Sequence, residues 1–178
     1  MSQLEHERTL NEGVTAWNRW RDAHPECIPD LSGLDLTGRL LQGTNFSKTN
    51  LSGAFLTVAE LEKAQLDGAD LQNANLTGAD LTSISAQHAN FAQADLSFAI
   101  LTFASMDEAS FEGARLSEAI LYNVSARNAN FKKARFRETI LTGTDFSGCD
   151  FTGATLQDLS PDGVIFPIGM PPFVKVKK

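Results

Sequence analysis

Residues 69–81 read ADLQNANLTGADL, in which a small residue, a polar residue and a leucine recur every five positions. The same spacing extends over residues 29–158, where 26 central positions hold 16 leucines and 7 phenylalanines. The other three centres are Ala86, Met106 and Ala126. Alanine stands two residues before the centre in 16 of the 26 repeats, so the pattern fixes a second, small position as well.

A five-residue period excludes the two ordinary secondary structures. Five steps carry an α-helix round by roughly 140°, so the leucines would spread around it instead of forming a stripe. In an unbroken strand, an odd repeat would send successive leucines to opposite faces. The chain must therefore turn a corner in every repeat. Four corners close a square coil of about 20 residues, and coils stacked at the strand spacing predict about 6.5 coils in a rod on the order of 30 Å long.

The tandem runs 69–73, 74–78 and 79–83 resemble pentapeptide repeats of the A(D/N)LXX type. The resemblance covers about three quarters of the chain. It implies an all-β solenoid, a right-handed quadrilateral β-helix, in which the central residue and the small residue before it point inward. The handedness comes from the resemblance and not from the spacing.

Three parts are expected: a cap and linker over residues 1–28, the β-helix over 29–158, and an irregular tail over 159–178. Residues 2–23 predict one amphipathic helix, because apolar residues recur at helical spacing and a proline follows. A β-helix exposes unpaired backbone groups at each end, so we expect this helix to lie across the first coil as a cap. The alternative is a partner-binding helix. Its apolar residues are Leu10, Val14, Trp17 and Trp20.

The tail is apolar but interrupted by prolines, which predicts an irregular extended segment over residues 162–174. We expect its apolar side chains to cover the C-terminal edge of the solenoid. The alternative is that this edge forms a dimer interface. The covering side chains are expected to be Val164, Ile165, Phe166 and Ile168.

The first coil departs from the pattern, because its small positions hold Pro29, Leu34 and Arg39. Terminal repeats are expected to be atypical, since one of their faces meets a cap instead of a neighbouring coil. An inward Arg39 would need a carboxylate or a carbonyl group as its partner.

Residues 20 apart are expected to stack on successive coils. In one column the centres Ala86 and Ala126 are small, but the inward positions two residues before them hold the larger Ile84 and Val124. The larger side chain at one inward position compensates for the smaller one at the other, so we expect the interior to stay packed. The alternative for that column is a ligand cavity. Another column predicts a ladder of stacked aromatic rings: Phe91, Phe111, Phe131 and Phe151.

Glycine ends many repeats near both ends of the solenoid, whereas between Ser83 and Glu138 only Gly113 does so. A type II corner needs a residue that tolerates positive φ. The distribution therefore predicts type II corners at the ends and mostly other turn types in the middle.

One outward column is apolar where aspartate or asparagine is usual. Ile100, Ile120 and Ile140 follow one another at 20-residue spacing in the slot just before the centre. We expect them to form, with Phe98, Phe103 and Tyr122, a contiguous exposed patch of a few hundred Å², the size at which exposed patches mark interfaces. The expected partner is another protein or a second copy of the chain. The alternative is that the tail or the helix covers this patch.

The charges are unevenly placed along the chain. Between residues 60 and 112 nine acidic residues face a single lysine, and a basic band follows over residues 127–137. The net charge of −7 disfavours direct nucleic-acid binding. Some members of the resembled family act as acidic mimics of duplex DNA on DNA gyrase, so a topoisomerase-binding mimic is the alternative function. The candidate acidic surface is Glu60, Glu62, Asp67, Asp70, Asp80, Asp95 and Asp107.

The sequence shows no constellation typical of catalysis. His6, His24 and His88 are scattered, and Cys27 and Cys149 form no spaced motif, so we expect no enzyme activity, metal, cofactor or small-molecule substrate. No segment approaches the length of a membrane-spanning helix, and residues 1–8 do not resemble a signal peptide. We therefore expect a cytoplasmic, non-enzymatic interaction scaffold without membrane contact.

Overall fold

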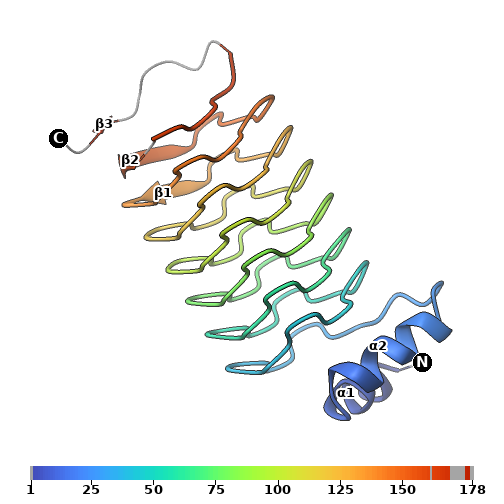
Figure 1. Cartoon of the computed structure of the whole chain (residues 1–178). Coiled ribbons are helices and arrows are strands. Elements are labelled where there is room, and N and C mark those ends of the chain that lie inside the picture. The colour runs from blue at the N-terminus through green and yellow to red at the C-terminus, as the bar shows by residue number, and fades with distance from the viewer. Residues whose placement is uncertain (1, 161, 169–174, 177–178) are drawn as a thin grey trace.

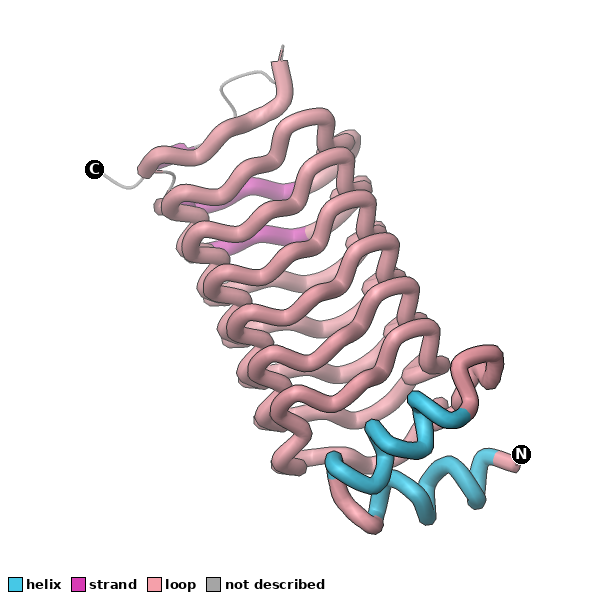
Figure 2. Tube along the Cα trace, turned by 45° about the vertical axis from the view of Figure 1, so that its right-hand side comes forward, coloured by secondary structure: helices cyan, strands magenta, loops and turns pink. Residues whose placement is uncertain are grey.

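The computed structural model describes residues 2–160, 162–168 and 175–176. Two short helices come first, α1 (Gln3–Asn11) and α2 (Val14–Ala23). A rod of stacked coils follows, most of it built from isolated bridges and tight turns, as Figures 1 and 2 show. Three short strands lie toward its C-terminal end and pair in parallel: β1 (Arg135–Arg137), β2 (Thr155–Leu159) and β3 (Lys175–Val176).

Every coil pairs with the next through residues 20 apart. The parallel bridges run from Asp30↔Asn50 to Asp145↔Ile165, so the ladder continues beyond residue 158. Each bridge is held from both sides, because a centre donates its N–H to the next coil and the residue before it donates to the previous coil. This is the register that the five-residue period predicts.

The centres and the small residues fill the interior of the rod. Almost all of them are buried, and the shifted residues Ile84, Ala86, Val124 and Ala126 are at most 2% exposed. The predicted phenylalanine ladder is present, with centroid distances of 4.8, 4.9 and 5.2 Å between successive rings from Phe91 to Phe151. The interior is therefore packed by the side chains that the pattern assigns to it.

The corners differ from the prediction. In the glycine-poor middle, from Ser83 to Glu138, the last residue of each non-glycine repeat still has a φ between 52° and 62°. The prediction of mostly other turn types there was wrong. Each corner N–H is bonded to the next coil, as Phe98 is to the Ser117 carbonyl at 2.9 Å, and these bonds hold the left-handed conformation without glycine.

The N-terminal helix is interrupted. Residues 2–23 form two helices instead of the single one predicted, because Gly13 has a φ of 103° and cannot continue α1. Leu10 and Trp17 are buried in the main core, whereas Val14 and Trp20 are half-buried. Each helix thus contributes one fully buried apolar residue to the core, Leu10 from α1 and Trp17 from α2.

Side chains of both helices bond to backbone groups at the open edge of the first coil. Trp17 Nε1 donates to the Asn45 carbonyl at 2.8 Å, and Arg21 donates to the Ser47 carbonyl at 2.8 Å. The Arg39 guanidinium donates to the Leu10 carbonyl and to the Asn11 side chain, which supplies the carbonyl partner that its inward position requires.

The described part of the tail covers the other end only in part. Val164 and Phe166 pack against the core, and the Phe166 ring lies 6.0 Å from that of Phe146. Ile165 and Ile168 are exposed, so the prediction that they cover the edge was wrong. Ile165 is the bridge residue of its rung, and such residues point outward in this fold. Residues 169–174 lie outside the described residues.

Neither α1 nor α2 is long enough and apolar enough to cross a membrane.

Candidate interaction face

The bridge columns divide the surface of the rod into four faces. The third face carries Leu40, Glu60, Asp80 and then the three isoleucines, and we call its apolar part, Ile100, Ile120 and Ile140, the isoleucine ladder. Its members are direct bridge partners, Ile100↔Ile120 and Ile120↔Ile140. Their side chains are partly exposed, Ile100 by 36% and Ile140 by 39%. The 20-residue spacing thus brings them together as predicted.

Aromatic residues flank the ladder at both corners of this face. Phe98 lies at the corner before Ile100, and Phe103 and Tyr122 lie at the corner after the ladder. The Phe103 and Tyr122 rings meet edge to face with centroids 5.9 Å apart. Phe98, Phe103 and Tyr122 are 54%, 57% and 42% exposed. The six residues therefore form one surface, which we call the apolar face.

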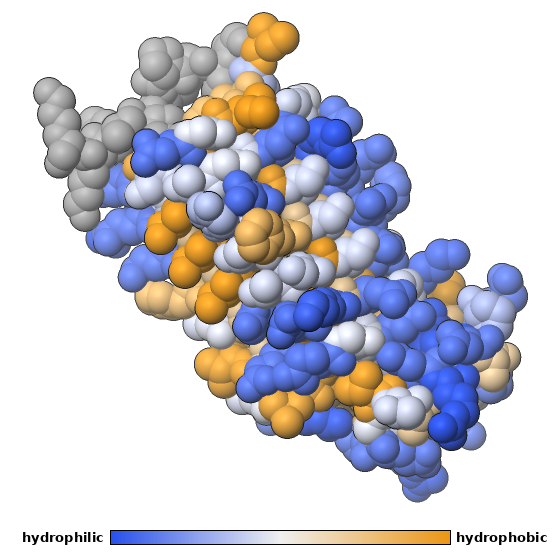
Figure 3. Space-filling view, in the orientation of Figure 1, coloured by the Kyte–Doolittle hydropathy of each residue, from blue (hydrophilic) through white to orange (hydrophobic). Residues whose placement is uncertain are grey.

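Acidic residues border the apolar face, and sequence reasoning did not include two of them. Asp80 is the bridge partner of Ile100, and Glu60 is the bridge partner of Asp80. Glu118 and Glu138 follow Phe98 at 20-residue spacing along the same corner, where Arg137 pairs with Glu138 at 3.2 Å. The 20-residue register was the signal that would have found them. In the space-filling view of Figure 3, apolar side chains form a stepped series over successive coils, with polar surface beside it.

The seven residues of the candidate acidic surface do not share a face. Glu60 and Asp80 belong to the third face and Glu62 to the corner after it, whereas Asp70 lies on the first face and Asp95 on the second. Asp67 and Asp107 lie at the corner between the fourth and first faces. The carboxylates are thus distributed around the rod.

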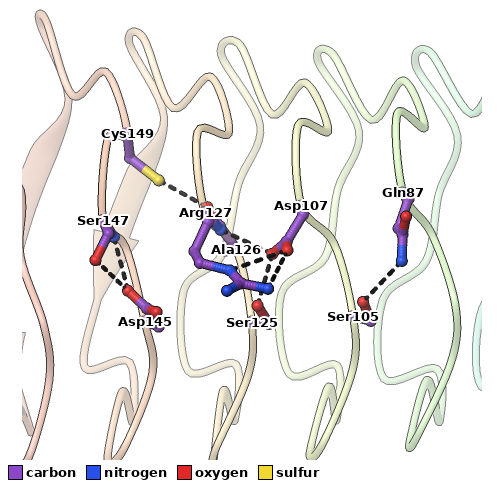
Figure 4. A network of polar contacts seen from close by, with 9 residues as sticks. All are labelled: Gln87, Ser105, Asp107, Ser125, Ala126, Arg127, Asp145, Ser147 and Cys149. Atoms are coloured by element: carbon purple, nitrogen blue, oxygen red, sulfur yellow. Dashed lines mark hydrogen bonds and ion pairs between the residues drawn. The ribbon is translucent and has the colours of Figure 1, made fainter.

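Several of these carboxylates bond to neighbouring coils. Asp107 accepts hydrogen bonds from the Ser125 hydroxyl at 2.6 Å and from the Arg127 guanidinium at 2.8 and 3.0 Å (Figure 4). Burial opposes the ionisation of Asp107, but these hydrogen bonds outweigh it and hold its pKa below the ordinary value. Asp67 accepts hydrogen bonds from the Ser85 hydroxyl at 2.7 Å and from the Gln87 backbone N–H at 2.8 Å.

A shallow polar hollow of about 190 Å³ lies on the second face, lined by Gln93, Gly113, Arg115 and Arg135. Arg115 and Arg135 are bridge partners, and Arg115 also pairs with Asp95 at 3.3 Å. Of the four lining residues, only Arg135 belongs to the basic band. It holds no nucleophile or acid–base pair that would indicate catalysis.

His6 is buried at the junction of α1 with the first coil, which the sequence did not reveal. Its Nδ1 accepts the Asp30 N–H at 3.1 Å, and its Nε2 lies 3.7 Å from the Cys27 sulfur. Burial lowers the pKa of His6 below its ordinary value. Since Nδ1 is an acceptor, the neutral ring carries its proton on Nε2. His6 is a structural residue of the junction.

The two cysteines are free and lie at different ends. Cys149 is buried, and burial raises the pKa of its thiol to about 12, so this thiol stays protonated. Among the described residues, no group of three or more histidine, cysteine or acidic side chains is placed to hold a metal ion.

A protein-family model described as pentapeptide repeats matches eight copies, over residues 30–64, 45–82, 87–122 and 119–158. Comparison with curated proteins finds no match. Among solved structures, the pentapeptide repeat protein alr5209 from Nostoc Pcc 7120 is 24% identical, with a TM-score of 0.50, over 66% of this chain and 84% of that one.

Two further structures are similar over most of the chain. QnrB1, a plasmid-mediated fluoroquinolone resistance protein, is 22% identical with a TM-score of 0.48, over 80% of this chain and 76% of that one. HetL, involved in heterocyst differentiation regulation in Nostoc sp. strain PCC 7120, is 25% identical with a TM-score of 0.28, over 79% and 88%.

Proposed function

Because the chain belongs to the pentapeptide-repeat family, we propose that it is a non-enzymatic scaffold that binds another protein through its apolar face. The observation that carries this proposal is the cluster of six large side chains on neighbouring coils, bordered by acidic residues. Exposed apolar patches of a few hundred Å² on soluble proteins mark interaction sites. Pentapeptide repeat proteins have, in general, a right-handed quadrilateral β-helix fold, and hydrogen-bonded stacked coils hold such a surface rigid.

The positions of Phe98 and Phe103 support an external role. Both occupy corner positions with positive φ, 62° and 60°, which are unfavourable for bulky residues. Both are also more than half exposed, so neither gains much from burial within the protein. Glycine occupies the equivalent place in other coils, as Gly78 and Gly143 do. A partner that covers the two rings would account for their presence.

We propose further that the solenoid has about 6.5 coils between residues 29 and 158 and that the two helices cap its first coil. The bonds from Trp17 and Arg21 to edge carbonyls support the cap, because they pair backbone groups that would otherwise invite another strand. With its N-terminal edge covered, the scaffold binds partners through the faces of the rod and not by pairing a strand with that edge. The cytoplasm is its proposed location.

The alternative function is an acidic mimic of duplex DNA that binds a topoisomerase. The net charge of −7 favours it. Against it, the candidate carboxylates are distributed over the rod, and Asp95 and Asp107 are paired with arginines. The apolar face is therefore the better supported site.

The test is recovery of partners from a native extract by the tagged protein, beside the variant Ile100→Asp/Ile120→Asp. Aspartate is the usual residue in this slot, so the variant is expected to fold. The matched control is Phe55→Asp/Val58→Asp, which replaces two exposed apolar residues on an earlier coil. A protein recovered by wild type and control but lost by the variant supports the scaffold. A topoisomerase retained by the variant and lost on charge reversal of Asp70 and Asp80 supports the mimic.

A further inference from the structure

The backbone of the apolar face restricts what can bind there. Ile120 donates its N–H to the Ala99 carbonyl at 2.9 Å, and its carbonyl accepts from Leu101 at 2.8 Å. The neighbouring coils use these groups in the same way, so the face has no free strand edge. A partner strand therefore cannot add to it by β-augmentation. Recognition must use side chains.

The width of the face suits a helix. Between two corners each face consists of three residues, such as Ala99 to Leu101, which span about 10 Å at 3.3 Å per residue. An α-helix with its side chains is about 10–12 Å across. Phe98 lies at one side of this strip and Phe103 and Tyr122 at the other, so a helix on the isoleucine ladder would contact rings on both sides.

The length of the ladder also suits a helix that lies along the rod. Three rungs at about 4.8 Å span about 10 Å from Ile100 to Ile140. Two turns of an α-helix, at 1.5 Å per residue, carry apolar residues at i, i+3, i+4 and i+7 over about the same distance. The apolar stripe of an amphipathic helix therefore matches the ladder rung by rung.

Charge decides between a second copy of the chain and a different partner. Glu60, Asp80, Glu118 and Glu138 border the face, and Arg137 is already paired with Glu138. Two copies, each with a net charge of −7, would bring acidic borders together. A partner with lysine or arginine beside its apolar stripe would meet opposite charges instead.

We propose that the apolar face receives an amphipathic α-helix of a basic partner, aligned along the rod with its apolar stripe on Ile100, Ile120 and Ile140. This inference rests on the proposed function and gives the partner a chemistry. The acidic borders steer the helix, and the ladder with its flanking aromatic rings provides the contact area.

The probe is a synthetic helical peptide of about 18 residues, with leucine at i, i+3, i+4 and i+7 and lysine at most other positions. A second peptide has the same composition, with the leucines spread around the helix, and a third has glutamate for lysine. Binding is measured by calorimetry at about 0.15 M salt, where long-range charge effects are screened. We expect the first peptide to bind at least tenfold more tightly than either of the others.

The protein variants make the result specific. Ile100→Asp/Ile120→Asp should remove the preference for the striped peptide, and Glu118→Lys/Glu138→Lys should weaken its binding. Phe55→Asp/Val58→Asp should leave the preference unchanged. Circular dichroism and the thermal midpoint check that each variant keeps the fold.

Three results would overturn the inference. Equal binding of striped and spread peptides would show a non-specific charge contact. If the wild-type protein has the mass of two chains in solution and the Ile100→Asp/Ile120→Asp variant has the mass of one, a second copy occupies the face. A partner recovered from extract and lost by this variant, with no binding of the striped peptide, would refute the helix and leave the proposed function standing.

Discussion

We predict that threonine at the inward small position stabilises late coils and destabilises early ones, because the stacking register decides whether its hydroxyl finds a hydrogen-bond partner. Thr139 and Thr144 are fully buried, and each donates its hydroxyl to a carbonyl 23 residues earlier, on the coil beneath. The Cys149 thiol does the same at 2.8 Å. The offset of 23 residues is thus a general feature of this position.

Thr44 and Thr49 are equally buried, but among the described residues neither hydroxyl has a hydrogen-bond partner. Twenty-three residues before them stand Arg21 and Glu26, in α2 and the linker, where the chain forms no coil. A buried hydroxyl without a partner costs about 1–3 kcal/mol. Replacing threonine by valine removes that cost and keeps the volume, so Thr44→Val and Thr49→Val should each stabilise the protein by about 1–3 kcal/mol.

The same substitution should have the opposite sign at the other end. Thr139→Val loses a hydrogen bond of 2.8 Å to the Leu116 carbonyl, which should cost about 1 kcal/mol or more. For a chain of this size each kcal/mol moves the thermal midpoint by about 2–4 °C. Thr44→Val/Thr49→Val should therefore melt several degrees above wild type and Thr139→Val several degrees below it.

The assay is thermal unfolding followed by circular dichroism, with urea midpoints as a second measure. If Thr44→Val and Thr49→Val destabilise the protein as much as Thr139→Val does, the 23-residue offset does not set the sign of the effect. Equal and negligible shifts at both ends would show that the hydroxyls contribute nothing to stability.

Two further predictions concern His6 and Val58. The pKa of His6 is lowered in the folded protein, so as the pH falls the unfolded chain binds a proton at this imidazole before the folded protein does. The contribution of His6 to the free energy of unfolding is therefore full above about pH 6.5 and is lost below it. Fluorescence of Trp17 and Trp20 should report this loss in wild type, and an unchanged pH profile in His6→Gln would contradict the assignment. Val58 is a β-branched residue at a φ of 49°, so Val58→Gly should raise the urea midpoint, with a gain of about 0.5–1 kcal/mol; a lower midpoint would show that the corner is unstrained.

The sequence alone predicted the interior and the stacking of outward residues. If every repeat forms one side of a coil, the same position of each repeat points inward. The burial of central residues such as Leu71 therefore followed directly from the five-residue period. The contact of Ile100 with Ile120 followed from the 20-residue coil in the same way. These features are repeated along the chain, and repetition is what makes them readable.

Features that occur once, or that depend on the stack as a whole, were not predictable. Glycine preference alone suggested a change of turn type in the middle coils, but bonds to the next coil keep residues such as Phe98 at positive φ. The break at Gly13 and the pairing of His6 with Asp30 depend on how the helices meet the first coil. Glu118 and Glu138 beside the apolar face are different: the 20-residue register places them on the corner of Phe98, so the sequence could have predicted them.

The register of the coils sets different rules for the interior and for the surface when the chain changes length. Deleting five residues removes one side of a coil, and every fifth residue still faces inward, so the interior remains apolar. All later residues, however, rotate by a quarter turn. A deletion of this kind between Ile100 and Ile120 would place the two on adjacent faces, whereas a deletion of residues 101–120 would remove one rung and leave Ile100 stacked on Ile140. The interior accepts changes in steps of five, and a surface that spans several coils accepts them only in steps of 20.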